Sequence, residues 1–177
     1  MLKDILLLLM SFFDKKQGVI EDKDKHGIDW SDPNAKISKY FTVNESLYLP
    51  SWGISHIPSA EEKIEILKLA KIMDIIRERI GKAIVVHVWM RPISVNCPGH
   101  ERHGENYNLF IGSKSLRSGH IFGKAVDFHV SGEEDFPKVR KQIEPWLESL
   151  EIRMEDNAGK WVHLDTLPVG NKRFFKP

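Results

Sequence analysis

From Ser118 to Asp127 the chain reads SGHIFGKAVD, and from Trp161 to Asp165 it reads WVHLD. Gly123 can turn the backbone sharply in the middle of the first stretch. Residues 125–130 then alternate apolar with small or polar side chains, which is the pattern of a half-buried strand. On such a strand the side chain of Asp127 lies on the face opposite to its apolar neighbours.

The second stretch predicts a neighbouring strand that brings a histidine to the same place. In residues 160–164, Val162 and Leu164 lie on one face, so His163 projects from the other. Two imidazoles and one carboxylate, His120, Asp127 and His163, suit one Zn²⁺ ion and leave a fourth tetrahedral position for water. We therefore expect a catalytic type of zinc site with these three ligands.

The same residues carry a resemblance to a known family. Together with Arg91 in the run WMRP (residues 89–92) and with KYFTVNE (residues 39–45), the two stretches resemble the D-alanyl-D-alanine carboxypeptidase-like zinc peptidases. That family shares its fold with the hedgehog signalling domain. The likeness covers roughly residues 37–167 and implies a hedgehog/DD-peptidase-like α+β fold with one zinc ion.

By this resemblance, three ligands and two substrate contacts can be assigned. The resemblance implies metal ligation by His120, Asp127 and His163. Arg91 matches the family arginine that holds a substrate carbonyl or carboxylate, for which its planar donor fork is suited. Ser118 matches a serine two residues before the first ligand and is the expected hydrogen-bond partner of the substrate.

The general base is less clearly marked than the ligands. Relatives often place a glutamate three residues before the last histidine, and that position holds Lys160 here. In other members the glutamate ends the preceding strand, as Glu155 would if residues 157–159 form the turn, because Asn and Gly tolerate positive φ. We take Glu155 as the base, with Asp156 as the alternative, since a one-residue change in register exchanges their faces.

The activity implied by the resemblance is hydrolysis of an amide bond in the stem peptide of peptidoglycan. The bond is either D-Ala-D-Ala, as in a carboxypeptidase, or L-Ala-D-Glu, as in an endopeptidase. A phage endolysin that accumulates in the cytoplasm before its release to the cell wall fits this chemistry, and periplasmic or extracellular action is the alternative. A zinc-stabilised binding module without catalytic turnover is the rival function.

Composition indicates a single compact domain with an N-terminal extension. The chain has 177 residues, 41% of them hydrophobic, and its 26 basic and 25 acidic side chains give a net charge of +1, so no nucleic-acid partner is expected. Cys97 is the one cysteine, which excludes an internal disulfide and a Cys-based zinc cluster. The apolar run 5–13 is too short to span a bilayer, so no stable membrane insertion is expected.

The chain divides by pattern into residues 1–36, a helical extension and linker, and residues 37–177, the zinc peptidase domain. Residues 60–80 form the clearest helix, with a capping box before it and a glycine after it. Residues 82–90 predict a strand with Arg91 at its end, and a second helix is expected to begin near Asp135. The expected class is α+β, with helices packed on a small, largely antiparallel sheet. The sequence leaves the oligomeric state open.

Two single residues and one pair of histidines are interpreted separately. His129 shares the predicted strand face of Asp127, so it either contacts the substrate or a ligand, or is a half-buried histidine with no such role. Asp165 could orient a histidine or pair with Arg91. The pair His100 and His103 lies in a glycine- and proline-containing loop, where solvated histidines are the expectation.

Overall fold

The computed structural model describes residues 26–96, 118–170 and 172–176. Residues 26–32 belong to a first unit and residues 33–176 to a second. The apolar run 5–13 and the loop with Cys97, His100 and His103 lie outside the described residues. The proposed boundary near residue 36 and the N-terminal helix stay predictions.

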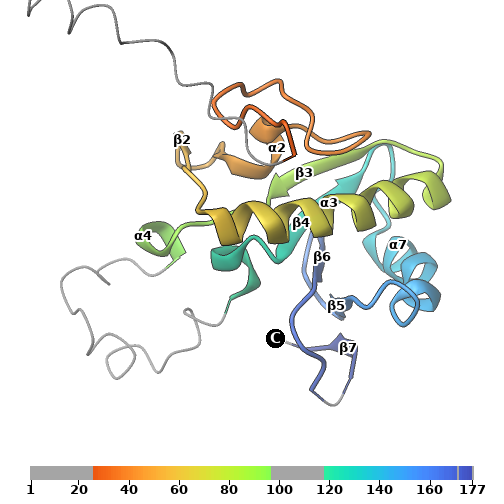
Figure 1. The fold of residues 1–177 in the computed structure, drawn as a ribbon. Coiled ribbons are helices and arrows are strands. Elements are labelled where there is room, and N and C mark those ends of the chain that lie inside the picture. The colour runs from red at the N-terminus through yellow and green to blue at the C-terminus, as the bar shows by residue number, and fades with distance from the viewer. Residues whose placement is uncertain (1–25, 97–117, 171, 177) are drawn as a thin grey trace, which may run out of the picture. The chain divides into compact units, whose positions relative to one another are not determined.

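The second unit is α+β and is built on a mixed, mostly antiparallel sheet of five strands in the order β3-β4-β6-β5-β7 (Figure 1). Its strands are β3 (Ile84–Val88), β4 (Ala125–Val130), β5 (Arg153–Glu155), β6 (Val162–Asp165) and β7 (Phe174–Phe175). All neighbours are antiparallel except β5 and β7, which run parallel. The expected α+β class and antiparallel tendency are thus confirmed, and the expected strands lie within a few residues of their predicted positions.

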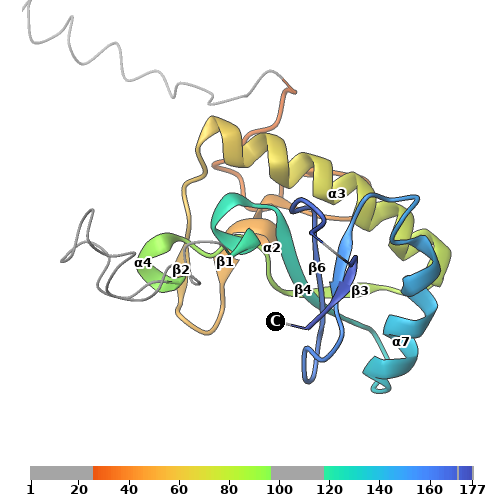
Figure 2. The same cartoon turned by 90° about the horizontal axis from the view of Figure 1, so that it is seen from below.

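The long helix α3 (Ala60–Ile80) matches its predicted bounds. Ser59 and Glu62 complete the capping box, each side chain accepting a hydrogen bond from the backbone N–H of the other. Gly81 ends the helix in the left-handed conformation with φ of 73°. Figures 1 and 2 show α3 running across one face of the sheet, so this helix provides the covering layer of the core.

The shorter elements connect the strands and flank the sheet. They are α2 (Val43–Leu47), β1 (Tyr48–Leu49), β2 (Ile54–Ser55), α4 (Ile93–Asn96), the 3₁₀ turn η3 (Gly119–Phe122), α7 (Phe136–Ile143) and the 3₁₀ turn η4 (Glu144–Trp146). Asp135 caps α7 by accepting a hydrogen bond from the Lys138 N–H, and the helix gives way to η4 at Pro145, as expected of a proline inside a helix. Among the described residues, no helix is both long enough and apolar enough to cross a membrane.

The two faces of the sheet differ in chemistry. Val126, Phe128 and Leu164 are fully buried and form the core layer under the helices. Asp127 and His163, which alternate with them, are Cα partners across β4 and β6 and project from the other face. Alternation along two adjacent strands therefore sets a polar row on the face that α3 leaves uncovered.

Candidate metal centre

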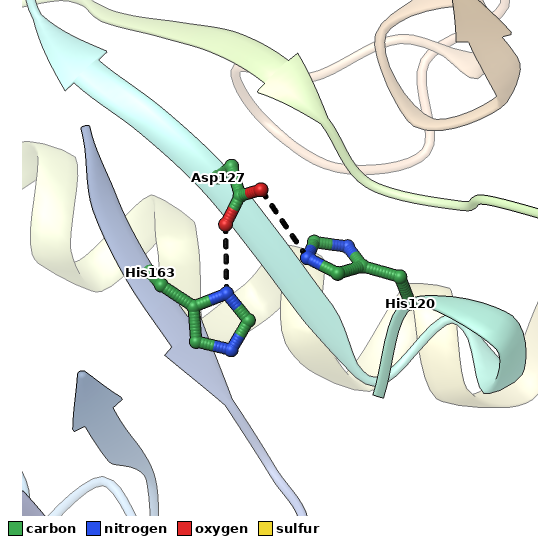
Figure 3. Close-up of side chains that lie close together, drawn as sticks. All are labelled: His120, Asp127 and His163. Carbon is green, nitrogen blue, oxygen red and sulfur yellow. Dashed lines mark hydrogen bonds and ion pairs between the residues drawn. The ribbon is translucent and has the colours of Figure 1, made fainter. Parts of the chain in front are cut away.

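His120, Asp127 and His163 come together on the face of the sheet opposite to α3 (Figure 3). Each offers one ligand atom, and these atoms all lie within 4.8 Å of one another. Asp127 comes from β4, His163 from β6 and His120 from η3, which immediately precedes β4. The group of three predicted from the sequence is therefore a structural cluster that could hold a metal ion.

A hydrogen bond to the backbone of Trp89 fixes the orientation of His120. Its Nδ1 lies 2.8 Å from the carbonyl oxygen of Trp89, so Nδ1 carries the proton and donates it. This leaves Nε2 facing Asp127, with 3.3 Å between Nε2 and Oδ2. The carbonyl oxygen of His120 in turn accepts a hydrogen bond of 3.0 Å from the backbone N–H of Arg91. The residue is 2% exposed, so contacts within the protein and not solvent orient its ring.

A glycine turn makes this placement possible. Gly123 ends η3 with φ of 70°, a backbone conformation that residues other than glycine rarely adopt. A Cβ atom there would lie 2.8 Å from Cγ1 of Ile66 and 3.1 Å from the carbonyl oxygen of Glu62. Gly123 also accepts a hydrogen bond of 3.3 Å from the indole Nε1 of Trp89. The turn thus packs tightly on α3 while it directs His120 toward Asp127.

Asp127 is the central acceptor of the group. Its Oδ1 lies 2.7 Å from Nδ1 of His163, and its Oδ2 faces His120. Burial by itself would raise the pKa of Asp127, but the hydrogen bonds to the two imidazoles outweigh burial and lower the pKa well below its ordinary value. The carboxylate is therefore ionised at neutral pH, as a metal ligand must be.

His163 lies between two carboxylates. Nδ1 faces Asp127, and Nε2 lies 3.5 Å from Oδ2 of Asp165. Burial by itself would lower the pKa of His163, but the hydrogen bonds to Asp127 and Asp165 outweigh burial and raise the pKa to about 9. In the metal-free protein at neutral pH, His163 is therefore an imidazolium, and its proton occupies the place that a metal would take.

The donor set fits a tetrahedral zinc ion. Zinc bonds of about 2.0–2.2 Å to nitrogen and oxygen place two ligand atoms roughly 3.3–3.5 Å apart. The separation between His120 Nε2 and Asp127 Oδ2, 3.3 Å, meets this requirement. The separation of 2.7 Å between His163 and Asp127 is that of a hydrogen bond and needs to widen by less than 1 Å. Nitrogen, nitrogen and oxygen donors from a protein leave one position for a further ligand.

Arg91 and Ser118, the expected substrate contacts, flank the first ligand. Arg91 lies three residues after the end of β3, and its backbone N–H donates a hydrogen bond to the carbonyl oxygen of His120. The Nε of Arg91 is buried and has no hydrogen-bond partner among the described residues. Ser118 is half-buried before η3, and its side chain makes no capping hydrogen bond. Ser118 is close to His120 along the chain and Arg91 is linked to it by its backbone hydrogen bond, while their contact with a substrate stays a prediction.

The register of the β5–β6 hairpin bears on the general base. Arg153 pairs with Asp165 and Met154 with Leu164, so the next position places Glu155 opposite His163. Glu155 thus shares the open face with His163, because cross-strand partners lie on one face. Its role as the base stays a prediction.

Asp156, the alternative base, lies past the end of the strand. It lines a hollow of about 640 Å³ together with Arg140 and Lys141 of α7. Gly159, with φ of 63°, supplies the positive-φ residue that was expected in this turn. Register and surroundings therefore favour Glu155 over Asp156.

Sequence reasoning missed the residue that holds Asp165. The guanidinium of Arg153 binds this carboxylate at two points, with Nε 2.7 Å from Oδ1 and Nη2 2.9 Å from Oδ2. Asp165 thus lies beside a histidine, His163, and its arginine partner is Arg153 and not Arg91. The pairing follows from the register of β5 and β6, for which the residue types alone give no signal.

A second contact between histidines was also missed. Nδ1 of His129 lies 2.8 Å from Nε2 of His87 on the neighbouring strand β3. The β3–β4 register shifts between Val86 and Val88, so His87 is the extra residue of a β-bulge. Val85 is the cross-strand partner of His129, so His87, two residues further along β3, lies diagonally across from His129.

No protein-family model, curated protein or solved structure matches the chain. The fold and the site together define an α+β protein with a two-histidine, one-aspartate cluster on the open face of its sheet. That cluster is the starting point for assigning a function.

Proposed function

We propose that this protein is a zinc-dependent peptidase of the hedgehog/DD-peptidase-like fold that hydrolyses an amide bond in peptidoglycan stem peptides. The observation that carries the proposal is the clustering of His120, Asp127 and His163, whose ligand atoms, one from each residue, all lie within 4.8 Å of one another. Sites in which the protein supplies three ligands of this kind and leaves one position open are typical of catalytic zinc. The resemblance of the surrounding sequence to the D-alanyl-D-alanine carboxypeptidase-like peptidases supplies the substrate class.

Each residue of the site has a defined task in this proposal. When bound, zinc acts as a Lewis acid that polarises the scissile carbonyl and lowers the pKa of water. Glu155 accepts a proton from the attacking water and returns it to the leaving amine. Arg91 donates hydrogen bonds to the carbonyl oxygen as negative charge develops on it. The buried Nε of Arg91, which lacks a partner among the described residues, supports a role in binding an oxygen of the substrate.

The open side of the sheet supports access of an extended peptide. Asp127 and His163 lie on the face that α3 does not cover, and both are only partly buried. A stem peptide can therefore reach the cluster without displacing the core. The cut is made at D-Ala-D-Ala in a carboxypeptidase or at L-Ala-D-Glu in an endopeptidase, and an endolysin acting on the cell wall would use either reaction.

The test is digestion of purified muropeptides, with fragment masses as the measurement. We expect cleavage with zinc present and its loss after treatment with a chelator, with recovery on adding zinc back. The fragment masses identify the bond. Zinc-loaded protein that leaves both D-Ala-D-Ala and L-Ala-D-Glu intact would overturn the peptidase proposal. In that case retention of muropeptides on the immobilised protein would support the rival function, a zinc-stabilised binding module.

A further inference from the structure

Behind His163 lies a chain of contacts that the three-ligand cluster does not explain. Asp165 is 1% exposed, and its carboxylate accepts three hydrogen bonds: two from Arg153 and one of 2.9 Å from the backbone N–H of Leu167. A buried carboxylate held by three donors cannot rotate freely. Its Oδ2 lies 3.5 Å from Nε2 of His163, on the side of the ring opposite to Asp127.

Arg153 is itself held in place by a neighbouring strand. Its guanidinium lies over the ring of Phe175, 4.6 Å from the ring centroid, in the geometry of a cation–π contact. Phe175 belongs to β7, which pairs in parallel with β5 next to Arg153. The ring of Phe175 also meets His163 edge-on, with 6.4 Å between the two centroids. Arg153 is thus fixed by its strand, by an aromatic ring and by a buried carboxylate.

We propose that Arg153 is a positioning residue that acts through Asp165 to hold the imidazole of His163 with Nδ1 toward the metal site. The inference rests on the proposed function to the extent that the cluster binds zinc. A carboxylate hydrogen-bonded to the far nitrogen of a metal-bound histidine fixes both the tautomer and the direction of the ring. The guanidinium fixes that carboxylate at two points, which a single ammonium group cannot do.

A purely structural role of the ion pair between Arg153 and Asp165 predicts a different result. Such a pair would contribute to folding, and its loss would lower the stability of the protein without changing the zinc affinity of the molecules that remain folded. If Arg153 has a positioning role, its loss lowers the zinc affinity of the folded protein. The ring of His163 is then ordered only when zinc binds, and this ordering reduces the free energy of binding. The two roles are therefore separated by measuring zinc affinity and unfolding on the same variants.

The experiment compares Arg153→Gln and Arg153→Lys with the matched control Arg173→Lys. Arg173 also binds a carboxylate through two nitrogens, that of the exposed Glu148, but neither residue contacts the cluster. Zinc affinity is measured by competition with a chromophoric chelator, and urea unfolding reports the folded fraction. We expect zinc affinity to fall roughly 10–100-fold in Arg153→Gln, as for other partners of metal-bound histidines. Arg153→Lys should recover part of that loss, and Arg173→Lys should change affinity less than about twofold.

A spectroscopic measurement reports the ring directly. Long-range ¹H–¹⁵N spectra of the zinc-loaded protein should show His163 with metal on Nδ1 and a proton on Nε2, and Arg153→Gln should broaden or divide this signal. If Arg153→Gln does not fold, the same comparison is made with Arg153→Lys alone. Folded variants that bind zinc within twofold of the wild type and keep the His163 signal would overturn the inference.

The outcome is independent of peptide cleavage. Intact muropeptides together with weakened zinc binding in Arg153→Gln would leave the positioning role standing and overturn the peptidase proposal. Cleaved muropeptides together with unchanged zinc binding would do the reverse. Wild-type protein that binds no zinc would overturn both.

Discussion

Strand β4 carries two polar side chains on the face opposite to α3, and each meets a histidine of a neighbouring strand. Asp127 meets His163 of β6 at 2.7 Å, and His129 meets His87 of β3 at 2.8 Å. The two contacts are similar in length but differ in what surrounds them. The first has a carboxylate between two imidazoles, whereas the second consists of two imidazoles without a hydrogen bond to a carboxylate in the described part of the chain.

The surroundings move the histidine pKa values in opposite directions. The carboxylates beside His163 raise its pKa to about 9, although burial opposes this. The pKa of His87 is lowered, first by burial and then by the neighbouring His129, against a smaller opposing effect of Asp127. An imidazole pair becomes a candidate metal centre when carboxylates lie close enough to balance the charge of the ion. Proximity of two histidines is not sufficient.

Removal of the central carboxylate should have the largest effect. Asp127→Asn keeps the size of the side chain but removes the charge and one ligand, so we expect zinc affinity to fall more than about 100-fold and peptide cleavage to fall on the order of 1000-fold. Chelator competition and muropeptide digestion measure the two effects. Retention of wild-type zinc affinity in this variant would show that the cluster is not the metal centre.

A substitution in the glycine turn that directs His120 is expected to have the next largest effect. Gly123→Ala forces a left-handed residue and a close contact with Ile66, so it should lower the free energy of unfolding by about 3 kcal/mol. Gly132→Ala is the matched control, because Gly132 has φ of 71° but no atom within 4 Å of an added Cβ. The control should lose only about 1 kcal/mol. Equal losses in urea unfolding would contradict the packing argument.

The pH dependence of zinc binding tests the raised pKa of His163. Since His163 has a pKa of about 9 in the metal-free protein, zinc must displace its proton. Apparent zinc affinity should therefore rise roughly tenfold per pH unit, or about 100-fold between pH 6.5 and 8.5, with release of about one proton per zinc. Calorimetry in buffers of different ionisation enthalpy measures this proton. Affinity that is independent of pH would contradict the raised pKa.

The same shift gives the sign for stability of the metal-free protein. A histidine whose pKa is raised on folding contributes stability that is complete below its unfolded pKa of about 6.5. That stability is lost as the pH rises through the folded pKa of about 9. Unfolding of metal-free protein should thus become easier by up to about 3 kcal/mol over this range. Zinc-loaded protein should not show this decline.

The smallest effect is expected at the second pair. His129→Gln removes the ring that meets His87 without touching the three ligands, so zinc affinity and cleavage should change less than about twofold. The measurements are those used for Asp127→Asn. A large loss of cleavage with unchanged zinc affinity would show that His129 contacts the substrate, which is the alternative interpretation of its position beside Asp127.

Local patterns predicted the scaffold and the clustering of the three candidate ligands. The capping box and the terminal glycine gave the bounds of α3, because both signals act within a few residues. Alternation along β4 and β6 placed Asp127 and His163 on one face, which is a property of any strand. The cluster was predictable because its geometry depends on strand period and not on side-chain detail.

Contacts that depend on register were not predictable. Arg153 meets Asp165 only because the β5–β6 hairpin pairs at one register, and a shift of one residue would turn both side chains to the other face. His87 meets His129 through a bulge that interrupts the strand pattern. The choice between Glu155 and Asp156 depends on the same hairpin. Residue types alone do not fix register, so the support around the ligands had to come from the structure.

The separation of the ligands along the chain has a kinetic consequence. Asp127 and His163 are 36 residues apart and meet only when β4 and β6 pair, and long-range pairings of this kind slow folding. If the cluster binds zinc, the ion can meet all three ligands only once this pairing has formed. The ion should slow unfolding in proportion to its affinity and leave the folding rate nearly unchanged, so that loaded protein persists through brief denaturing stress that inactivates the metal-free form.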